Sequence, residues 1–255
     1  QTVIFAQLEA HDCNAELYIN GIAALRITPR QVPIANAAVE QYLISGPNRI
    51  TLIVEPGPSP SRARTVHQEF TGQPMRATGR LIRFPEGVPG FVEYGELLAA
   101  APFAGSQDAD LPRKFPVEVS AAVDLGPAHG RWAWQDAPPL KLDQALIDQV
   151  GVLFAQLESA IRSNDIERFW QLTELKLQDM LRAYPALTKE LIRADLELLF
   201  AHVLTGKDPV LPRAPSRHDF RLLAGDRLLQ LVEPQVDDMV LSHEPIDGSA
   251  NSRRP

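Results

Sequence analysis

Proline is distributed unevenly along this chain, and its distribution limits where helices can form. Most of the 22 prolines lie before position 140, whereas Pro185 is the only proline between Leu142 and Thr205. Proline can neither continue a helix nor donate to a central β-ladder, so we expect strands and irregular loops first and helices afterwards. A chain of 255 residues is long enough for one large domain or two smaller ones.

Short segments rich in alternating apolar and polar residues before position 140 predict β-strands. Asn20-Gly21, a dipeptide typical of hairpin turns, ends one of them, and Gly46-Pro47-Asn48 lies between two more. Strands at this spacing predict an all-β sandwich, jelly-roll-like, over residues 1–135. The expected strands cover residues 2–10, 15–20, 22–27, 38–44, 49–55, 77–84, 91–98 and 116–125.

Apolar residues recur at three- and four-residue intervals between positions 142 and 205, which is the spacing of amphipathic helices. We expect three helices there. Asn164 is the expected N-cap of the second helix, which Pro185 ends. Thr188 is expected to cap the third helix, which Gly206 terminates.

A short antiparallel sheet is expected to follow the helices. Together they form a smaller α+β domain over residues 141–247, which a linker at 135–141 joins to the sandwich. Residues 248–255 are polar and are expected to form a disordered tail. The expected strands of the sheet cover residues 220–223, 227–232 and 239–243.

Composition argues against several classes of function. The formal net charge of −7 disfavours nucleic-acid binding, and no apolar run approaches the roughly 20 residues that span a bilayer. Cys13 is the single cysteine, so we expect no intrachain disulfide and no thiolate zinc site. The chain begins at Gln1 rather than Met, so we expect that a preceding segment was removed, and the compartment stays open between periplasm and cytoplasm.

Two segments resemble known families. Residues 15–21 and 43–52 resemble the galactose-binding-like sandwich of accessory and adhesive modules, in which a turn phrase leads into a core strand. Residues 220–231 resemble the terminal hairpin of the cystatin-like and NTF2-like α+β cone. The first resemblance implies sugar binding or a scaffold role, and the second implies a cone whose interior often houses a carboxylate–histidine dyad. Neither transfers a ligand residue to this chain.

Residues with catalytic chemistry are present but do not form a known motif. His11 and Cys13 would share one face of a strand, yet a zinc site needs two more ligands, so we expect a structural or surface role. Asp195 and His202 are seven residues apart on one helix face, about 10 Å, which is too far for a direct hydrogen bond. We therefore predict no catalytic residue, no metal and no cofactor.

Aromatic residues supply the candidate ligand-binding site. Trp132 and Trp134 lie two residues apart in a segment expected to be extended, so their rings would point to the same side. Paired tryptophans can stack on sugar rings, or they can plug an interface between domains. Together with Tyr94 they are the predicted ligand-binding residues.

Three functions fit these observations. The favoured one is a non-enzymatic, two-domain bacterial interaction protein with a protein partner, such as an immunity or envelope-accessory protein. The second is a carbohydrate-binding module that uses the three aromatic residues named above. The third is a small-molecule binder or enzyme that uses the interior of the C-terminal cone. That interior would be lined by Phe169, Trp170, Phe200 and either His202 or His218.

Overall fold

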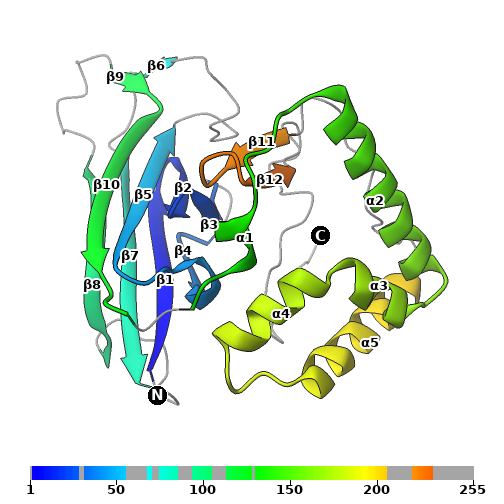
Figure 1. The fold of residues 1–255 in the computed structure, drawn as a ribbon. Helices are drawn as coiled ribbons and strands as arrows, with labels where there is room; N and C mark the ends of the chain where they lie inside the picture. Colours follow the sequence, from blue (N-terminus) through cyan, green and yellow to red (C-terminus); the bar gives the residue numbers. More distant parts are fainter. Residues whose placement is uncertain are drawn as a thin grey trace.

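The computed structural model describes residues 2–28, 32–55, 68–70, 75–85, 94–104, 113–127, 130–205 and 220–231 (Figure 1). Within these residues, two four-stranded antiparallel sheets are followed by helices and by a small two-stranded sheet. This order confirms the predicted β-sandwich followed by an α+β part. None of the described helices has both the length and the hydrophobicity needed to cross a bilayer.

The two large sheets have the strand orders β4-β1-β7-β8 and β10-β5-β2-β3. Strands β6 (Gln68–Phe70) and β9 (Arg113–Phe115) form a separate short pair. The strands of the two large sheets are β1 (Thr2–His11), β2 (Asn14–Ile19), β3 (Ile22–Ile27), β4 (Ile34–Ala38), β5 (Pro47–Glu55), β7 (Arg76–Pro85), β8 (Glu96–Ala104) and β10 (Val117–Asp124).

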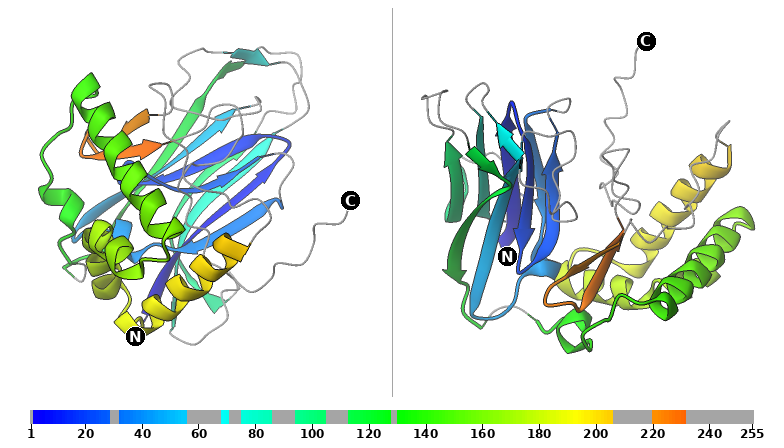
Figure 2. Two further views of the ribbon diagram at one scale, coloured as in Figure 1. Left: turned by 90° about the vertical axis from the view of Figure 1, so that its right-hand side faces the viewer. Right: turned by 90° about the horizontal axis from the view of Figure 1, so that it is seen from above.

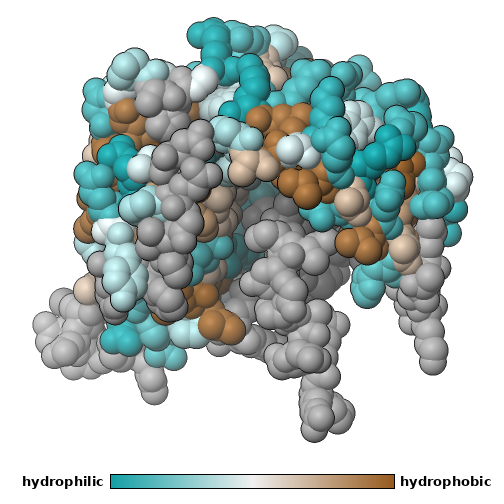
Figure 3. Space-filling model, turned by 90° about the horizontal axis from the view of Figure 1, so that it is seen from below, coloured by the Kyte–Doolittle hydropathy of each residue, from teal (hydrophilic) through white to brown (hydrophobic). Residues whose placement is uncertain are grey.

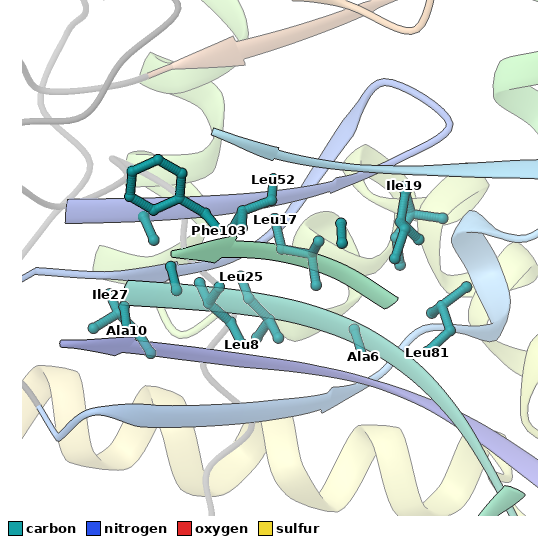
Figure 4. Close-up of a cluster of buried hydrophobic side chains, with 14 of the residues drawn as sticks. Ala6, Leu8, Ala10, Leu17, Ile19, Leu25, Ile27, Leu52, Leu81 and Phe103 are labelled. Atoms are coloured by element: carbon teal, nitrogen blue, oxygen red, sulfur yellow. The ribbon is translucent and has the colours of Figure 1, made fainter. Parts of the chain in front are cut away.

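The main hydrophobic core lies between the two sheets, where alternate residues of each strand point inward (Figure 4). Side chains at every second position of a strand share one face, so β1 sends Ala6, Leu8 and Ala10 toward Leu17 and Ile19 of β2. At the crossing from β1 to β2, Asp12 adopts a positive φ of 56°. The sandwich is therefore built by the period-two pattern that the sequence analysis used.

The predicted hairpin at Asn20-Gly21 is confirmed. Asn20 (φ 51°) and Gly21 (φ 80°) both occupy the left-handed region, as a two-residue turn with matching strand twist requires. Strands β2 and β3 pair antiparallel on either side of this turn. Asn20 also connects the turn to β5, the strand that pairs with β2 on its other side, because its side-chain oxygen accepts from the backbone N–H of Arg49 at 3.0 Å.

The strand predicted at residues 38–44 is wrong. That segment contains a short 3₁₀ helix, η1 (Glu40–Tyr42), while the strand β4 lies just before it. The Glu40 carboxylate accepts a hydrogen bond from the N–H of Ile4 at 2.7 Å, so a side chain replaces the backbone partner that a longer strand would supply. The next strand then begins at Pro47, within the predicted turn.

Within residues 130–205, which the structure describes without a gap, five helices follow the sandwich: α1 (Ala133–Asp136), α2 (Gln144–Arg162), α3 (Ile166–Leu172), α4 (Glu174–Ala183) and α5 (Lys189–Thr205). The short helix α1 occupies a segment that was predicted to be extended. The single second helix is also wrong, because it is divided at Thr173, whose hydroxyl donates back to the Phe169 carbonyl at 2.8 Å. Helix α4 ends before Pro185, as predicted.

Two of the predicted helix caps can be checked. Asn164 is not the N-cap of α3, because it has a left-handed φ of 55° and the side chain of Asp165 accepts from Arg168 N at 2.9 Å instead. The Thr188 cap is confirmed, since its hydroxyl accepts from Leu191 N at 3.2 Å. Gly206 and the strand predicted at 239–243 lie outside the described residues.

A β-hairpin of strands β11 (Phe220–Leu223) and β12 (Leu228–Leu231) lies between the sandwich and the helices (Figure 2). On one face, Leu223 packs with Tyr18 and Ile53 of the sandwich. On the other face, Phe220 and Leu231 pack against Phe154 of α2. The hairpin is thus covered on both sides and connects the two parts of the fold.

Candidate functional site

The two predicted tryptophans lie where the sandwich meets the helices. Trp132 is 3% exposed, and its indole N–H donates to the backbone carbonyl of Leu43. Trp134 is half-buried, and its N–H donates to the carbonyl of Gln41 at 3.4 Å. Both rings therefore reach the η1 segment of the sandwich, so the structure brings them together at this junction. Their predicted role in stacking on a sugar stays a prediction.

Helix α4 closes the same junction. The Tyr184 hydroxyl donates to the side-chain oxygen of Gln41, and Asp179 accepts from the N–H of Ala133 at 3.0 Å. The guanidinium of Arg182 lies 5.6 Å from the centre of the Trp132 ring, a distance typical of a cation–π contact. Burial raises the pKa of Tyr184, and the nearby Tyr42 and Glu40 raise it further. The junction is therefore a packed and hydrogen-bonded interface.

Tyr94, the third predicted ligand residue, lies on a different part of the sandwich. It is 63% exposed and precedes β8, an edge strand of the sheet β4-β1-β7-β8. At the adjacent Gly95, a Cβ atom would lie 2.3 Å from Ile82 Cγ2, so the backbone there covers the outer face of β7 closely. Trp132 and Trp134 instead contact the η1 segment. The three predicted ligand residues therefore lie at two separate places, one beside η1 and one beside β8.

A buried ionic cluster joins the hairpin to the sandwich, and the sequence analysis missed it. Arg221 on β11 donates to the Glu16 carboxylate at 3.1 Å and to the Tyr18 hydroxyl at 2.6 Å. Tyr18 in turn donates to Glu16 at 2.7 Å. Arg26 on β3 lies 3.9 Å from the same carboxylate. Glu16, Tyr18 and Arg221 are at most 5% exposed, so this cluster is sealed from solvent.

The charges in this cluster stabilise one another. Burial lowers the pKa of Arg221, but the ion pair with Glu16 and the contacts with Tyr18 outweigh it, so the pKa lies above its ordinary value. Removing Glu16 would leave the buried guanidinium of Arg221 without a counter-charge. Because the partners lie 205 positions apart, their contact fixes the C-terminal hairpin on the sandwich.

The histidines considered in the sequence analysis have different surroundings. His11 contacts Glu9 at 3.1 Å, and Arg80 reaches the same carboxylate at 3.2 Å on the outer face of β1 and β7. These contacts with His11 and Arg80 lower the pKa of Glu9. Cys13 is buried and its thiol points to the carbonyl of Arg76, so His11 and Cys13 do not share a site. The described residues contain no group of three or more metal-ligand side chains.

Two of the aromatic residues predicted to line the interior of the C-terminal part are in contact. Phe200 is 1% exposed and meets Phe169 edge to face, with ring centres 5.2 Å apart. His202 is exposed and two residues away, which places it on the opposite side of α5 from Phe200. The structure thus separates this histidine from the two aromatic rings. His218 lies outside the described residues.

The outer side of α5 exposes large apolar side chains. Ile192 and Phe200 are buried on its inner side, while Leu191 and Leu198 are 52% and 69% exposed. Figure 3 shows hydrophobic patches interrupting the hydrophilic surface on the lower face, where α4 and α5 lie. Over half of the large exposed hydrophobic side chains of the described chain are on helices. These are Val152, Leu153, Leu175, Leu191 and Leu198.

The apolar periodicity of α5 was the sequence signal for this surface. The sequence analysis took such periodicity as evidence of a face that covers a core, but α5 has two apolar faces and only the one with Ile192 and Phe200 is buried. Neither a family model, nor a curated protein, nor a solved structure matches this chain. The candidate site is therefore defined by its own chemistry: an exposed apolar surface on α5, and a buried, hydrogen-bonded junction where α1 and α4 meet the sandwich.

Proposed function

We propose that this chain is a non-enzymatic protein that binds a protein partner through its helical part. The observation that supports this proposal is the exposure of Leu191 and Leu198 on the outer side of α5. A surface helix needs only one apolar face to cover a core, and the face with Ile192 and Phe200 already does so. Contiguous apolar side chains left in water commonly mark an interaction surface.

The way the helices are held supports the same proposal. The hydrogen bonds of Trp132, Trp134 and Tyr184 fasten α1 and α4 to the sandwich. The hairpin packs on α2 through Phe154 and on the sandwich through Leu223. The sandwich thus supports the helices, which in this proposal present their outer sides to a partner.

The finer predictions belong to this proposal and stay predictions. They are a jelly-roll-like sandwich, an NTF2- or cystatin-like C-terminal domain, and an immunity or envelope-accessory role in a bacterium. Carbohydrate binding by Trp132, Trp134 and Tyr94 and small-molecule chemistry in the C-terminal part are the alternative functions.

Affinity capture with the full-length chain tests the proposal. Tagged wild type and the double variant Leu191→Gln/Leu198→Gln are incubated with lysate of the organism that makes the protein. A matched variant, Leu97→Gln, removes an exposed leucine of the sandwich instead. We expect one stoichiometric partner with wild type and with Leu97→Gln, and loss of that partner with the double variant. Equal capture by all three proteins would contradict a role of the helical part.

A further inference from the structure

Helix α5 carries a continuous apolar stripe on its exposed side. Leu191, Ala194, Leu198 and Ala201 are all exposed and follow the spacing three, four, three. At 3.6 residues per turn, these positions fall within a stripe about 80° wide and about 15 Å long. The stripe is what the a and d positions of a coiled-coil helix form, and the described chain leaves it in solvent.

The stripe lies opposite the face that α5 uses for its own core. Ile192 and Phe200 are buried, and they are separated from the stripe by roughly half a turn of the helix. The two alanines lower the surface at alternate positions, so the backbone of a second helix can approach closely there. Large apolar side chains of that helix would fill the spaces between Leu191 and Leu198.

The charges beside the stripe are acidic. Glu190 and Glu197 border one edge and Asp195 borders the other, all exposed. Of the basic residues of α5, Lys189 and Arg193 lie away from the stripe, and Arg193 pairs with Glu167 and, at 3.5 Å, with Glu197. His202 lies beside Asp195 on the same edge of the stripe. A helix that packs on the stripe would therefore place its flanking residues next to carboxylates.

These charges argue against a second copy of the chain as the occupant. An antiparallel pair of α5 helices would match Leu191 with Ala201 and Ala194 with Leu198, which suits the packing. The same arrangement brings the two Asp195 carboxylates together near the symmetry axis, and like charges at that position are unfavourable. A helix with basic flanks satisfies both the apolar stripe and its acidic borders.

We propose that α5 binds an amphipathic helix of a partner protein, whose apolar seam packs along Leu191, Ala194, Leu198 and Ala201 and whose flanking residues are lysine or arginine. This inference rests on the proposed function and names its class of partner. Helix-in-groove recognition of this kind uses apolar anchors at three- and four-residue spacing for affinity. The flanking charges set which helix is accepted.

Two synthetic peptides test the proposal against the full-length chain. Both are stapled helices of three heptads with leucine at a and d, and they differ only in lysine or glutamate at e and g. Binding is followed by fluorescence anisotropy at low and at physiological salt. We expect the lysine peptide to bind, the glutamate peptide to bind at least about tenfold more weakly, and added salt to weaken only the lysine peptide.

Variants locate the binding surface. Leu191→Gln/Leu198→Gln should weaken the lysine peptide at least about tenfold, as loss of central anchors does. Leu175→Gln on α4 removes an equally exposed leucine and should leave the affinity unchanged. Asp195→Asn/Glu190→Gln should reduce the preference for lysine flanks and flatten the salt dependence. Circular dichroism confirms that each variant folds.

Several results would overturn the proposal. They are equal affinity for both peptides, no binding of the lysine peptide, or binding that the stripe variants do not change. A wild-type dimer in sedimentation that Leu198→Gln abolishes would identify a second copy as the occupant. If the peptides fail while lysate capture still depends on Leu191 and Leu198, the proposed function stands and only the partner class is wrong.

Discussion

Arg221 donates a 3.1 Å hydrogen bond to the carboxylate of Glu16, 205 positions earlier in the chain, and both side chains are almost fully buried. This contact holds β11, which follows the helices in the chain, against β2, which lies near the start of the sandwich. The helical part is consequently attached to the sandwich at two places: through the hairpin, which packs on α2, and through the tryptophan junction at α1. The apolar stripe of α5 is exposed on the outer side of the helical part.

Removing the shared carboxylate should be the most damaging change in the ionic cluster. Glu16→Gln leaves Arg221 and Arg26 buried without a counter-charge, and we expect it to lower the free energy of unfolding by about 3–5 kcal/mol. Arg221→Met should cost less, because Arg26 stays 3.9 Å from Glu16. Urea unfolding monitored by circular dichroism measures both. The exposed pair of Arg83 with Glu96 is the control, and Glu96→Gln should leave the midpoint unchanged. Equal midpoints for Glu16→Gln and Glu96→Gln would refute the role given to the cluster.

The buried thiol should resist modification at neutral pH. Burial raises the pKa of Cys13 to about 11, so the reactive thiolate is scarce in the folded protein. We expect no reaction with a thiol-specific reagent at pH 7 until urea unfolds the chain. A raised pKa also means that folding favours the protonated thiol. This contribution to stability is present below the unfolded pKa of about 8.5 and is lost as pH rises through about 11.

A Cys13→Ala variant is the control for this alkaline effect, because it has no thiol to ionise. Unfolding midpoints are compared between pH 8 and pH 11 for both proteins. The wild type should lose stability more steeply than the variant over this interval. Fast labelling of the native protein at pH 7, or parallel pH profiles of the two proteins, would contradict the burial of this thiol.

The two tryptophans should differ in their contribution to stability. Trp132→Phe removes the donor to the buried Leu43 carbonyl, and we expect a loss of about 1–3 kcal/mol. Trp134→Phe should cost less, because its ring is half-buried and its bond to Gln41 is longer, at 3.4 Å. Urea unfolding gives both values. Trp170 fluoresces in both variants, so the difference in iodide quenching between them compares Trp132 with Trp134. Quenching of Trp134→Phe, which retains the buried Trp132, should be weaker than quenching of Trp132→Phe; the reverse order would show that Trp132 is accessible.

Comparing alanine substitutions at two glycines distinguishes the cost of backbone strain from the cost of a clash with the C-terminal hairpin. Gly21 and Gly46 both have φ of 80°, so alanine at either position costs about 1–2 kcal/mol of strain. At Gly21 alone, a Cβ would also lie 3.3 Å from the backbone of Ala224, while at Gly46 nothing lies within 4 Å. Gly21→Ala should therefore be more destabilising than Gly46→Ala in chemical unfolding. Equal losses would mean that the hairpin does not press on the β2–β3 turn.

Local sequence patterns were sufficient for the parts of the fold that local chemistry determines. The Asn20-Gly21 turn, the Thr188 cap and the end of α4 before Pro185 each depend on a few neighbouring residues. The η1 segment could not be found this way, because it depends on a hydrogen bond from Ile4 to Glu40, 36 positions away.

The candidate site was less predictable than the fold. Nothing near Glu16 or Arg221 signals a partner 205 positions away. The sequence singled out both tryptophans, but the carbonyls of Leu43 and Gln41 that accept their hydrogen bonds lie in a segment that was expected to be a strand. The stripe on α5 was visible as periodicity, yet a sequence cannot tell which of two apolar faces stays exposed.

Photo-crosslinking tests the central claim most directly, because it reports which surface touches a partner. A photoreactive amino acid replaces Leu198 on α5 in one full-length protein and Leu97 on β8 in another, both exposed in the structure. Each protein is irradiated in lysate of the organism that makes it. We predict one crosslinked protein from position 198 and none from position 97. A partner crosslinked only from position 97 would contradict the account and place the interaction on the sandwich.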